Sequence, residues 1–280
     1  SGGNQQLYLR SINSFESKVI PGTEGATIPF FSPDGQWIGF GANSQIWKIS
    51  VGGGAALKIC DAPGFRGAAW GPNDTIVLSP SITTGLSQVS AAGGTPQVLT
   101  KLKEGEAYHR WPQFLPDGKT ILFTIGMMTA SDDSSIAVQR LDSNEHKIVW
   151  RGGTYGRYVP TGHLVYYRAG MVMAMPFDTA RLEVIGTPEP VLDGVMHSGG
   201  DTGAAQFSFS DQGSLIYFPG GAPNADQLTL VWVDRKGVAQ PLPAPPHPYQ
   251  NPRLSPDGRR VALSITESGR SNIWIYDLAG

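Results

Sequence analysis

Four arginines stand at fixed distances before the turns of a repeated segment in this 280-residue sequence. Arg66 and Arg110 lie eight residues before the last residue of their turns, and Arg157 and Arg253 lie five residues before theirs. If the repeats surround a common opening, these guanidinium groups would meet there and bind carboxylates or phosphates through paired N–H donors. The predicted ligand-binding set is completed by polar residues near the same positions: His109, Asp201 and Asn251.

Acidic residues allow a second chemistry at the same opening. Glu24, Glu106 and Asp201, together with His109, would offer the oxygen-rich surroundings that Ca²⁺ prefers. The sequence contains no G-x-S-x-G elbow and no H-E-x-x-H metal motif. Catalysis is therefore the less favoured interpretation, and no cofactor is expected unless this Ca²⁺ site exists.

Composition restricts both the fold and the partners. With 36 glycines and 22 prolines, the chain is interrupted too often for a helical bundle, while 40% hydrophobic residues suffice for a packed core. A net charge of −2 argues against a nucleic-acid partner. Cys60 is the only cysteine, which excludes an intrachain disulfide, and no apolar run is long enough for membrane insertion.

The arginines belong to a segment that occurs six times. Its clearest copies are Phe30-Phe31-Ser32-Pro33-Asp34-Gly35 and Arg253-Leu254-Ser255-Pro256-Asp257-Gly258. Proline presets φ at the first corner of such a turn, and Asp and Gly tolerate the next one. The six copies end at residues 35, 74, 118, 162, 213 and 258, so successive copies are 39, 44, 44, 51 and 45 residues apart. This spacing is typical of four-stranded propeller blades.

We therefore predict an all-β protein, a six-bladed β-propeller of four-stranded antiparallel blades in a single domain over 1–280. The chain stops after a third strand of the last blade, so an N-terminal strand should complete that blade. Residues 17–21 are the expected completing strand, which leaves 7–12 as a surplus strand. Either the last blade then has an extra strand, or the sequence is part of a longer array. The predicted blades are about 27–60, 66–100, 108–151, 154–193, 203–243, and 249–280 with 7–22.

A family resemblance supports this prediction. The Ser-Pro-Asp-Gly turns, the strands Gln45-Ile46-Trp47-Lys48-Ile49 and Asn272-Ile273-Trp274-Ile275-Tyr276, and the Gly-Gly turns resemble TolB-like, WD-repeat-related β-propellers. His109-Arg110-Trp111-Pro112-Gln113-Phe114 and Leu230-Val231-Trp232-Val233-Asp234 are similar to propeller regions attached to bacterial, notably acidobacterial, serine/threonine kinases. The resemblance implies a recognition or sensor module and a bacterial extracytoplasmic location, periplasmic or cell-surface; cysteine poverty fits that location and the cytoplasm equally.

The function that follows is a non-catalytic recognition or scaffold propeller in a bacterial envelope or signalling protein. It is expected to bind a protein, a peptide or a small anionic ligand at the mouth of a central channel. The alternative is a Ca²⁺-dependent hydrolase of the lactonase or phosphotriesterase type, with its metal on the channel axis.

Overall fold

The computed structural model describes residues 6–11, 17–127, 134–197, 203–210, 213–220, 229–233, 237–242, 244, 246–247, 249–267 and 270–277. All regular secondary structure in these residues is β-strand. This part of the chain holds no helix suited to crossing a membrane. The chain divides into two compact units. One consists of Ser1–Lys58 with Gln206–Gly280, and the other is Ile59–Ala205.

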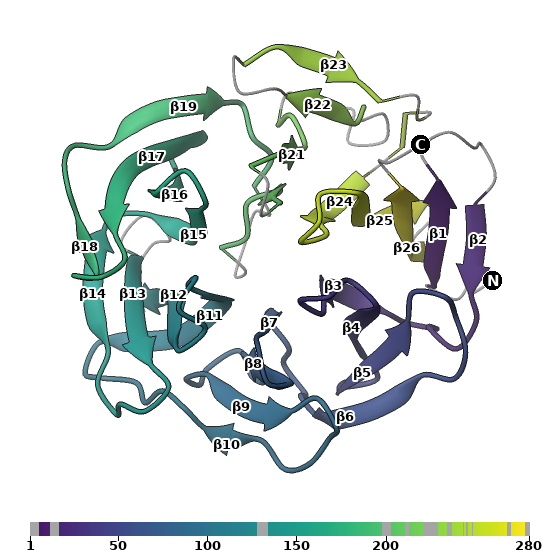
Figure 1. Cartoon of the computed structure of the whole chain (residues 1–280), viewed down its shortest axis with the longest axis horizontal. Helices are drawn as coiled ribbons and strands as arrows, with labels where there is room; N and C mark the ends of the chain where they lie inside the picture. The colour runs from purple at the N-terminus through teal and green to yellow at the C-terminus, as the bar shows by residue number, and fades with distance from the viewer. Residues whose placement is uncertain are drawn as a thin grey trace. The chain divides into compact units, whose positions relative to one another are not determined.

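The Ile59–Ala205 unit contains three sheets, which follow one another along the chain (Figure 1). The first consists of β7 (Ala68–Trp70), β8 (Thr75–Leu78), β9 (Ser87–Ser90) and β10 (Gln97–Val98). The second consists of β11 (Glu106–Phe114), β12 (Thr120–Met127), β13 (Ser135–Arg140) and β14 (Lys147–Arg151). The third consists of β15 (Thr154–Val159), β16 (His163–Arg168), β17 (Met171–Asp178), β18 (Glu183–Val184) and β19 (Glu189–Asp193).

The other unit also holds three sheets. The last strand of one of them, β6, extends beyond Lys58, where this part of the unit ends. One consists of β3 (Thr27–Phe31), β4 (Trp37–Ala42), β5 (Gln45–Ser50) and β6 (Leu57–Asp61). The second consists of β20 (Phe207–Phe209), β21 (Leu215–Tyr217), β22 (Val231–Val233) and β23 (Ala239–Pro241). The third consists of β24 (Tyr249–Leu254), β25 (Arg260–Glu267) and β26 (Arg270–Asp277) with β1 (Leu7–Ser11) and β2 (Ser17–Ile20).

These six sheets are the blades of a six-bladed β-propeller, which confirms the predicted fold. N-terminal strands complete the last blade, also as predicted, but the predicted order of these strands is wrong. β1 lies beside β26 and runs parallel to it, whereas β2 is an extra fifth strand at the edge. A parallel neighbour is possible because β1 comes from the other end of the chain and needs no hairpin connection. In the blade of β15–β19, both β18 and β19 pair with β17, so this blade also exceeds four strands.

The repeated turns have the geometry that their sequence requires. The last residue adopts positive φ in five copies, Gly35, Gly118, Gly162, Gly213 and Gly258, and Asp74 does so in the sixth. In the turn that ends at Gly118, the Asp117 carboxylate accepts hydrogen bonds from Lys119 N, Thr120 N and Thr120 Oγ1 at 2.9, 2.9 and 2.6 Å. The carboxylate therefore fastens the turn to the first residue of β12.

The first strand of most blades contains a bulge at the same repeat position. Seven residues before the end of the turn, five of the six copies place a residue with positive φ: Ile28, Gly67, Trp111, Tyr155 and Asn251. The strand pairing shifts register around this position in β3, β11, β15 and β24. A bulge redirects side chains and backbone groups of the strand. The bulge therefore interrupts the regular strand alternation close to Arg110 in β11, Arg157 in β15 and Arg253 in β24.

Candidate ligand-binding site

Three of the predicted arginines lie on or just before adjacent first strands of the Ile59–Ala205 unit. Arg66 precedes β7, Arg110 lies in β11 and Arg157 lies in β15. The backbone of Trp111 joins two of them, because its N–H donates to Arg66 O at 3.3 Å and its carbonyl accepts from Arg157 Nη1 at 2.7 Å. The three strands are neighbours in Figure 1. The structure thus connects Arg66 and Arg157 through the backbone of Trp111.

Two aromatic rings, those of Trp111 and Tyr155, pack between these two arginines. A β-carbon on Gly67 would lie 2.7 Å from Cε3 of Trp111, so the indole packs directly on the glycine. The Trp111 and Tyr155 rings meet edge to face with centroids 5.5 Å apart, and both residues are buried. The Arg157 guanidinium lies 4.1 Å above the centre of the Tyr155 ring, a cation–π contact. We call Arg66, Gly67, Trp111, Tyr155 and Arg157 the inner ladder.

The two guanidinium groups of the inner ladder have neutral partners. Arg66 Nη1 donates to Phe65 O at 2.8 Å, and its buried Nε atom has no hydrogen-bond partner among the described residues. Arg157 Nη1 donates to Trp111 O and, at 3.0 Å, to Gly156 O. Within the described part of the chain, neither arginine forms an ion pair with a carboxylate. Two positive charges are therefore held in place without a counter-charge from these residues.

Arg110 is placed differently from the other two arginines. Its side chain is buried, its Nη2 donates to Ile82 O at 2.9 Å, and its guanidinium lies 3.5 Å above the Tyr108 ring. Ile82 belongs to the loop between β8 and β9, so this arginine connects two neighbouring blades of the unit. A ligand would reach it less easily than it would reach Arg66 or Arg157, which are only half-buried.

The remaining predicted residues lie elsewhere. Asn251 and Arg253 belong to β24 of the other unit, where Asn251 N donates to Gln206 Oε1 and Arg253 Nη1 donates to Pro252 O at 2.9 Å. Glu24 is exposed in that unit, and Asp201 lies outside the described residues. The backbone N–H of Glu24 and the Gln6 amide lower the pKa of the Glu24 carboxyl, although slight burial opposes this shift. The ligand role of all these residues remains a prediction.

A second group of polar residues is buried in the blade of β11–β14. Glu106 and His109 lie three residues apart in β11, and His146 lies in the turn before β14. Glu106 Oε2 is 3.0 Å from His109 Nε2, and Glu106 Oε1 is 2.9 Å from His146 Nε2. The side chains of Glu106, His109 and His146 are only 6%, 0% and 2% exposed. We call these three residues the Glu–His cluster.

Burial and hydrogen bonds set the charges in the Glu–His cluster. Burial lowers the pKa of His109 to about 4, although the Glu106 carboxylate opposes this shift. Burial alone would raise the pKa of Glu106, but hydrogen bonds from Lys103 N and both imidazoles outweigh it and lower this pKa. At neutral pH, Glu106 is therefore ionised and His109 is neutral. His109 then donates from Nε2 to Glu106 and accepts at Nδ1 from Thr100 Oγ1, which is 2.7 Å away.

The sequence indicated part of these arrangements. Glu106 and His109 were predicted metal ligands only within a Ca²⁺ site that also needed Glu24 and Asp201. Their partner His146 was not predicted, because it lies 40 residues away from Glu106 in the chain and no motif spacing connects them. Trp111 and Tyr155 were not predicted either. Both occupy the bulge position of their repeats, which is the signal that an alignment of the six copies offers.

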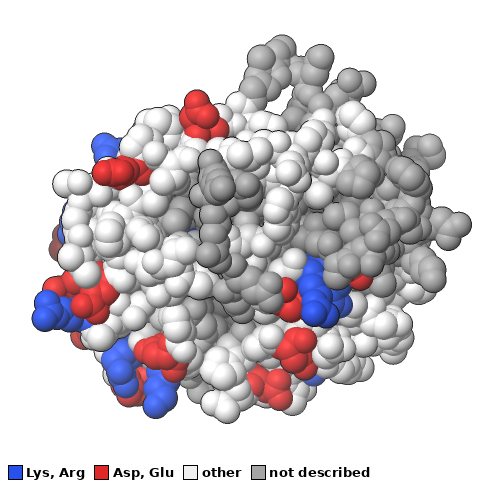
Figure 2. All heavy atoms as spheres, turned by 45° about the horizontal axis from the view of Figure 1, so that its top comes forward, with Lys and Arg blue, Asp and Glu red and all other residues white. Residues whose placement is uncertain are grey.

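The charges on the surface agree with the composition. On the face drawn in Figure 2, acidic and basic side chains of the described residues lie among one another, with no extended basic area.

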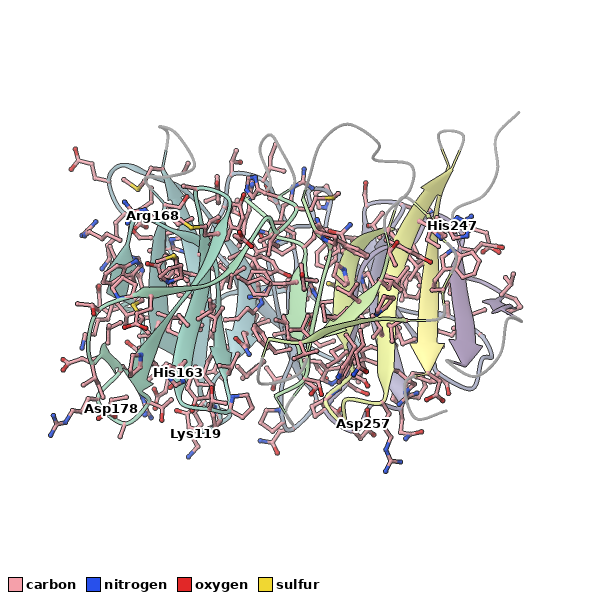
Figure 3. All side chains as sticks on the ribbon, turned by 90° about the horizontal axis from the view of Figure 1, so that it is seen from above. Lys119, His163, Arg168, Asp178, His247 and Asp257 are labelled. Carbon is pink, nitrogen blue, oxygen red and sulfur yellow. The ribbon has the colours of Figure 1, made fainter. Side chains whose placement is uncertain are left out.

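Figure 3 shows the two ends of β16, His163 and Arg168, at opposite ends of their blade. Lys119 and Asp178 lie at the same end as His163. Glu106, which begins β11, lies at the end of its blade away from the turn that holds Lys119.

Comparison with known proteins supports the fold more than the function. No family model matches the sequence. The uncharacterized peptidase YuxL of Bacillus subtilis (strain 168) is 28% identical over a stretch that covers 46% of this chain and 27% of YuxL. The chain therefore spans about a quarter of the length of that relative.

Several solved structures are similar in fold to this chain. A putative TolB from Agrobacterium tumefaciens matches with a TM-score of 0.65 and 16% identity over 98% of both chains. The gluconolactonase XC5397 from Xanthomonas campestris matches with a TM-score of 0.64 and 12% identity, over 86% of this chain and 82% of that one. An oligogalacturonate lyase from Vibrio parahaemolyticus matches at 0.60 and 11%, over 98% and 96%. The chain has a TolB-like six-bladed β-propeller fold. Identities this low establish the fold alone, and the fold serves binding proteins and enzymes alike.

Proposed function

We propose that this protein is a non-catalytic recognition propeller that binds acidic peptide segments at the inner ladder. The observation that carries the proposal is the pair of half-buried guanidinium groups, Arg66 and Arg157, which carbonyl oxygens hold and no described carboxylate neutralises. In this proposal the protein acts as a sensor or scaffold part of a bacterial extracytoplasmic protein.

The fixed position of Arg157 favours an anionic ligand. Its Nη1 atom is occupied by two carbonyl oxygens and its face by Tyr155, while the other N–H groups of the guanidinium remain as donors for a carboxylate. A guanidinium that is already held loses little side-chain entropy when it binds. A charge that is partly removed from water also attracts a counter-charge more strongly than an exposed one does.

The second candidate is the metal-dependent hydrolase, because gluconolactonase XC5397 shares the fold. Of its predicted ligands, Glu106 and His109 do meet in the structure. However, their side chains are 6% and 0% exposed, and Phe123 lies against His109 with ring centroids 4.8 Å apart. A substrate has no approach to such a position, so recognition is the function that we favour.

Selection from a random peptide library displayed on phage tests the proposal. We expect the wild-type chain to select sequences rich in Asp and Glu, and Arg66→Met and Arg157→Met to bind those peptides about tenfold more weakly or worse, since a hydrogen bond to a charged group contributes about 1.5–3 kcal/mol. Arg151→Met is the matched control, because Arg151 is an exposed arginine at the end of β14. Selected peptides without acidic enrichment, or an equal loss in Arg151→Met, would contradict the proposal.

A further inference from the structure

The Glu–His cluster has the ligand types of a zinc site. Two imidazoles and one carboxylate are a three-residue ligand set that proteins use for Zn²⁺, whereas Ca²⁺ prefers oxygen donors alone. The three possible ligand atoms, one from each residue, all lie within 4.8 Å of one another. We propose that Glu106, His109 and His146 bind a Zn²⁺ ion inside the blade of β11–β14, independently of the inner ladder.

The distances in the cluster fit a metal between the three side chains. Ligand atoms that bind Zn²⁺ at about 2.1 Å are separated by about 3.0–3.4 Å when the angle between the two bonds is near 90–110°. The two nitrogen–oxygen distances, 3.0 and 2.9 Å, lie at the short end of this range. Each imidazole faces a different oxygen of Glu106, so the carboxylate would bind the ion through both of its oxygens. Small side-chain rotations would bring the Nε2 atoms of His109 and His146 closer to each other.

A second layer of contacts orients the proposed ligands. His109 Nδ1 lies 2.7 Å from Thr100 Oγ1, and Lys103 N donates to Glu106 Oε2 at 2.7 Å. Metal-binding histidines commonly have such a partner on the second ring nitrogen, which fixes the ring and the tautomer. With zinc on Nε2, the single ring proton of His109 would be on Nδ1, and this N–H would donate a hydrogen bond to Thr100 Oγ1. The His109 imidazole remains neutral throughout.

The charges around the cluster suit a cation. Glu106 brings a negative charge into the blade, and each imidazole offers a ring nitrogen to a metal ion. The ammonium group of Lys103 lies beside the cluster; its Nζ forms an ion pair with Glu145 at 3.0 Å and donates to His146 O at 3.4 Å. The Glu145 carboxylate offsets the repulsion of this ammonium for a cation.

A metal at this position would connect segments that are far apart in the chain. It would join the start of β11 to the turn before β14, and through Thr100 it would reach the segment that follows β10. Zinc that binds only the folded chain adds its binding energy to the stability of the fold. The proposed role of the ion is therefore structural, and peptide binding at the inner ladder does not require it.

Titration of the full chain, freed of metal by dialysis against a chelator, with Zn²⁺ in a calorimeter tests the proposal. We expect one Zn²⁺ per chain and a raised unfolding temperature, with no displacement by excess Ca²⁺. His146→Gln and Glu106→Gln should bind zinc about 100-fold more weakly or worse, because even a lost outer partner costs roughly 10–100-fold. His163→Gln is the control, since this partly exposed histidine lies outside the cluster, at the turn edge in Figure 3.

A spectroscopic measurement on the wild-type chain covers the case in which the variants do not fold. Nitrogen NMR of the histidine rings should show the Nε2 signals of His109 and His146 shifting with one equivalent of Zn²⁺ while those of His163 stay in place. Absence of stoichiometric binding, or unchanged His109 and His146 signals, would show that the cluster is only a hydrogen-bonded part of the core. Acidic-peptide binding that survives chelation would leave the recognition proposal intact in either case.

Discussion

Replacing Gly67 with alanine should destabilise the Ile59–Ala205 unit at the inner ladder. Gly67 has a φ of +101°, a conformation that a residue with a β-carbon rarely adopts. The new methyl group would lie 2.7 Å from Cε3 and 3.1 Å from Cζ3 of Trp111. The indole cannot easily move away, because Trp111 is only 2% exposed and its ring packs against Tyr155.

Two costs combine in this variant. The left-handed backbone conformation costs about 1–2 kcal/mol for a non-glycine residue, and forcing extra volume into a packed core costs about 1–3 kcal/mol. The expected loss in the free energy of unfolding is therefore about 2–5 kcal/mol. Gly162→Ala separates the two costs, since Gly162 has a φ of +83° and a β-carbon there would meet nothing within 4 Å. It should lose about 1–2 kcal/mol.

Urea unfolding followed by circular dichroism and tryptophan fluorescence measures both variants. A double variant, Gly67→Ala with Trp111→Leu, should show a favourable coupling energy, because the leucine removes the ring that the methyl group strikes. The reasoning would be refuted if Gly67→Ala lost no more stability than Gly162→Ala, or if the coupling energy were zero. Either result would mean that the indole does not pack on Gly67 in solution.

Two further predictions concern the closure of the last blade and the repeated turns. Leu7→Ala in β1 should cost about 2–5 kcal/mol in thermal or urea unfolding, because Leu7 is 0% exposed, whereas Val19→Ala at a 41% exposed position in β2 should cost far less. Asp34, Asp117 and Asp257 have carboxyl pKa values below the usual range: a hydrogen bond from the Ser32 hydroxyl is the main cause for Asp34, and for the other two, hydrogen bonds outweigh burial. Their stabilising effect is complete above the unfolded pKa of aspartate and is lost as the pH falls through the folded pKa values. The free energy of unfolding, measured from pH 6 to pH 2.5, should therefore decline less in a variant with all three aspartates replaced by asparagine than in the wild type. An equal decline in the two proteins would contradict this assignment.

The turns and strands could be predicted because their chemistry is local. Pro, Asp and Gly specify a turn within a few residues, and the β-branched and aromatic runs after it specify a strand. The bulge could not be predicted in this way, since Ile28, Trp111 and Tyr155 are poor residues for positive φ. Packing against neighbouring strands forces this conformation on them, as the contacts of Trp111 with Gly67 and Tyr155 illustrate.

The candidate sites show the same limit. The arginines were found because repeat position is visible in a sequence, but the exchange of hydrogen bonds between Arg66, Trp111 and Arg157 depends on which strands become neighbours. His146 likewise meets Glu106 across 40 residues of the chain. Neither contact leaves a spacing pattern in the chain.

The pairing of β1 with β26 affects how the protein is made. A ribosome releases the strand Leu7–Ser11 long before it synthesises Arg270–Asp277, and at roughly 5–20 residues per second the delay is about 13–50 s. During that time the apolar side of the early strand, which includes Leu7, has no native cover from its partner. Newborn chains would therefore depend on holding factors, and a circular permutant that joins the two termini by a linker and opens at a different surface turn should fold with less aggregation.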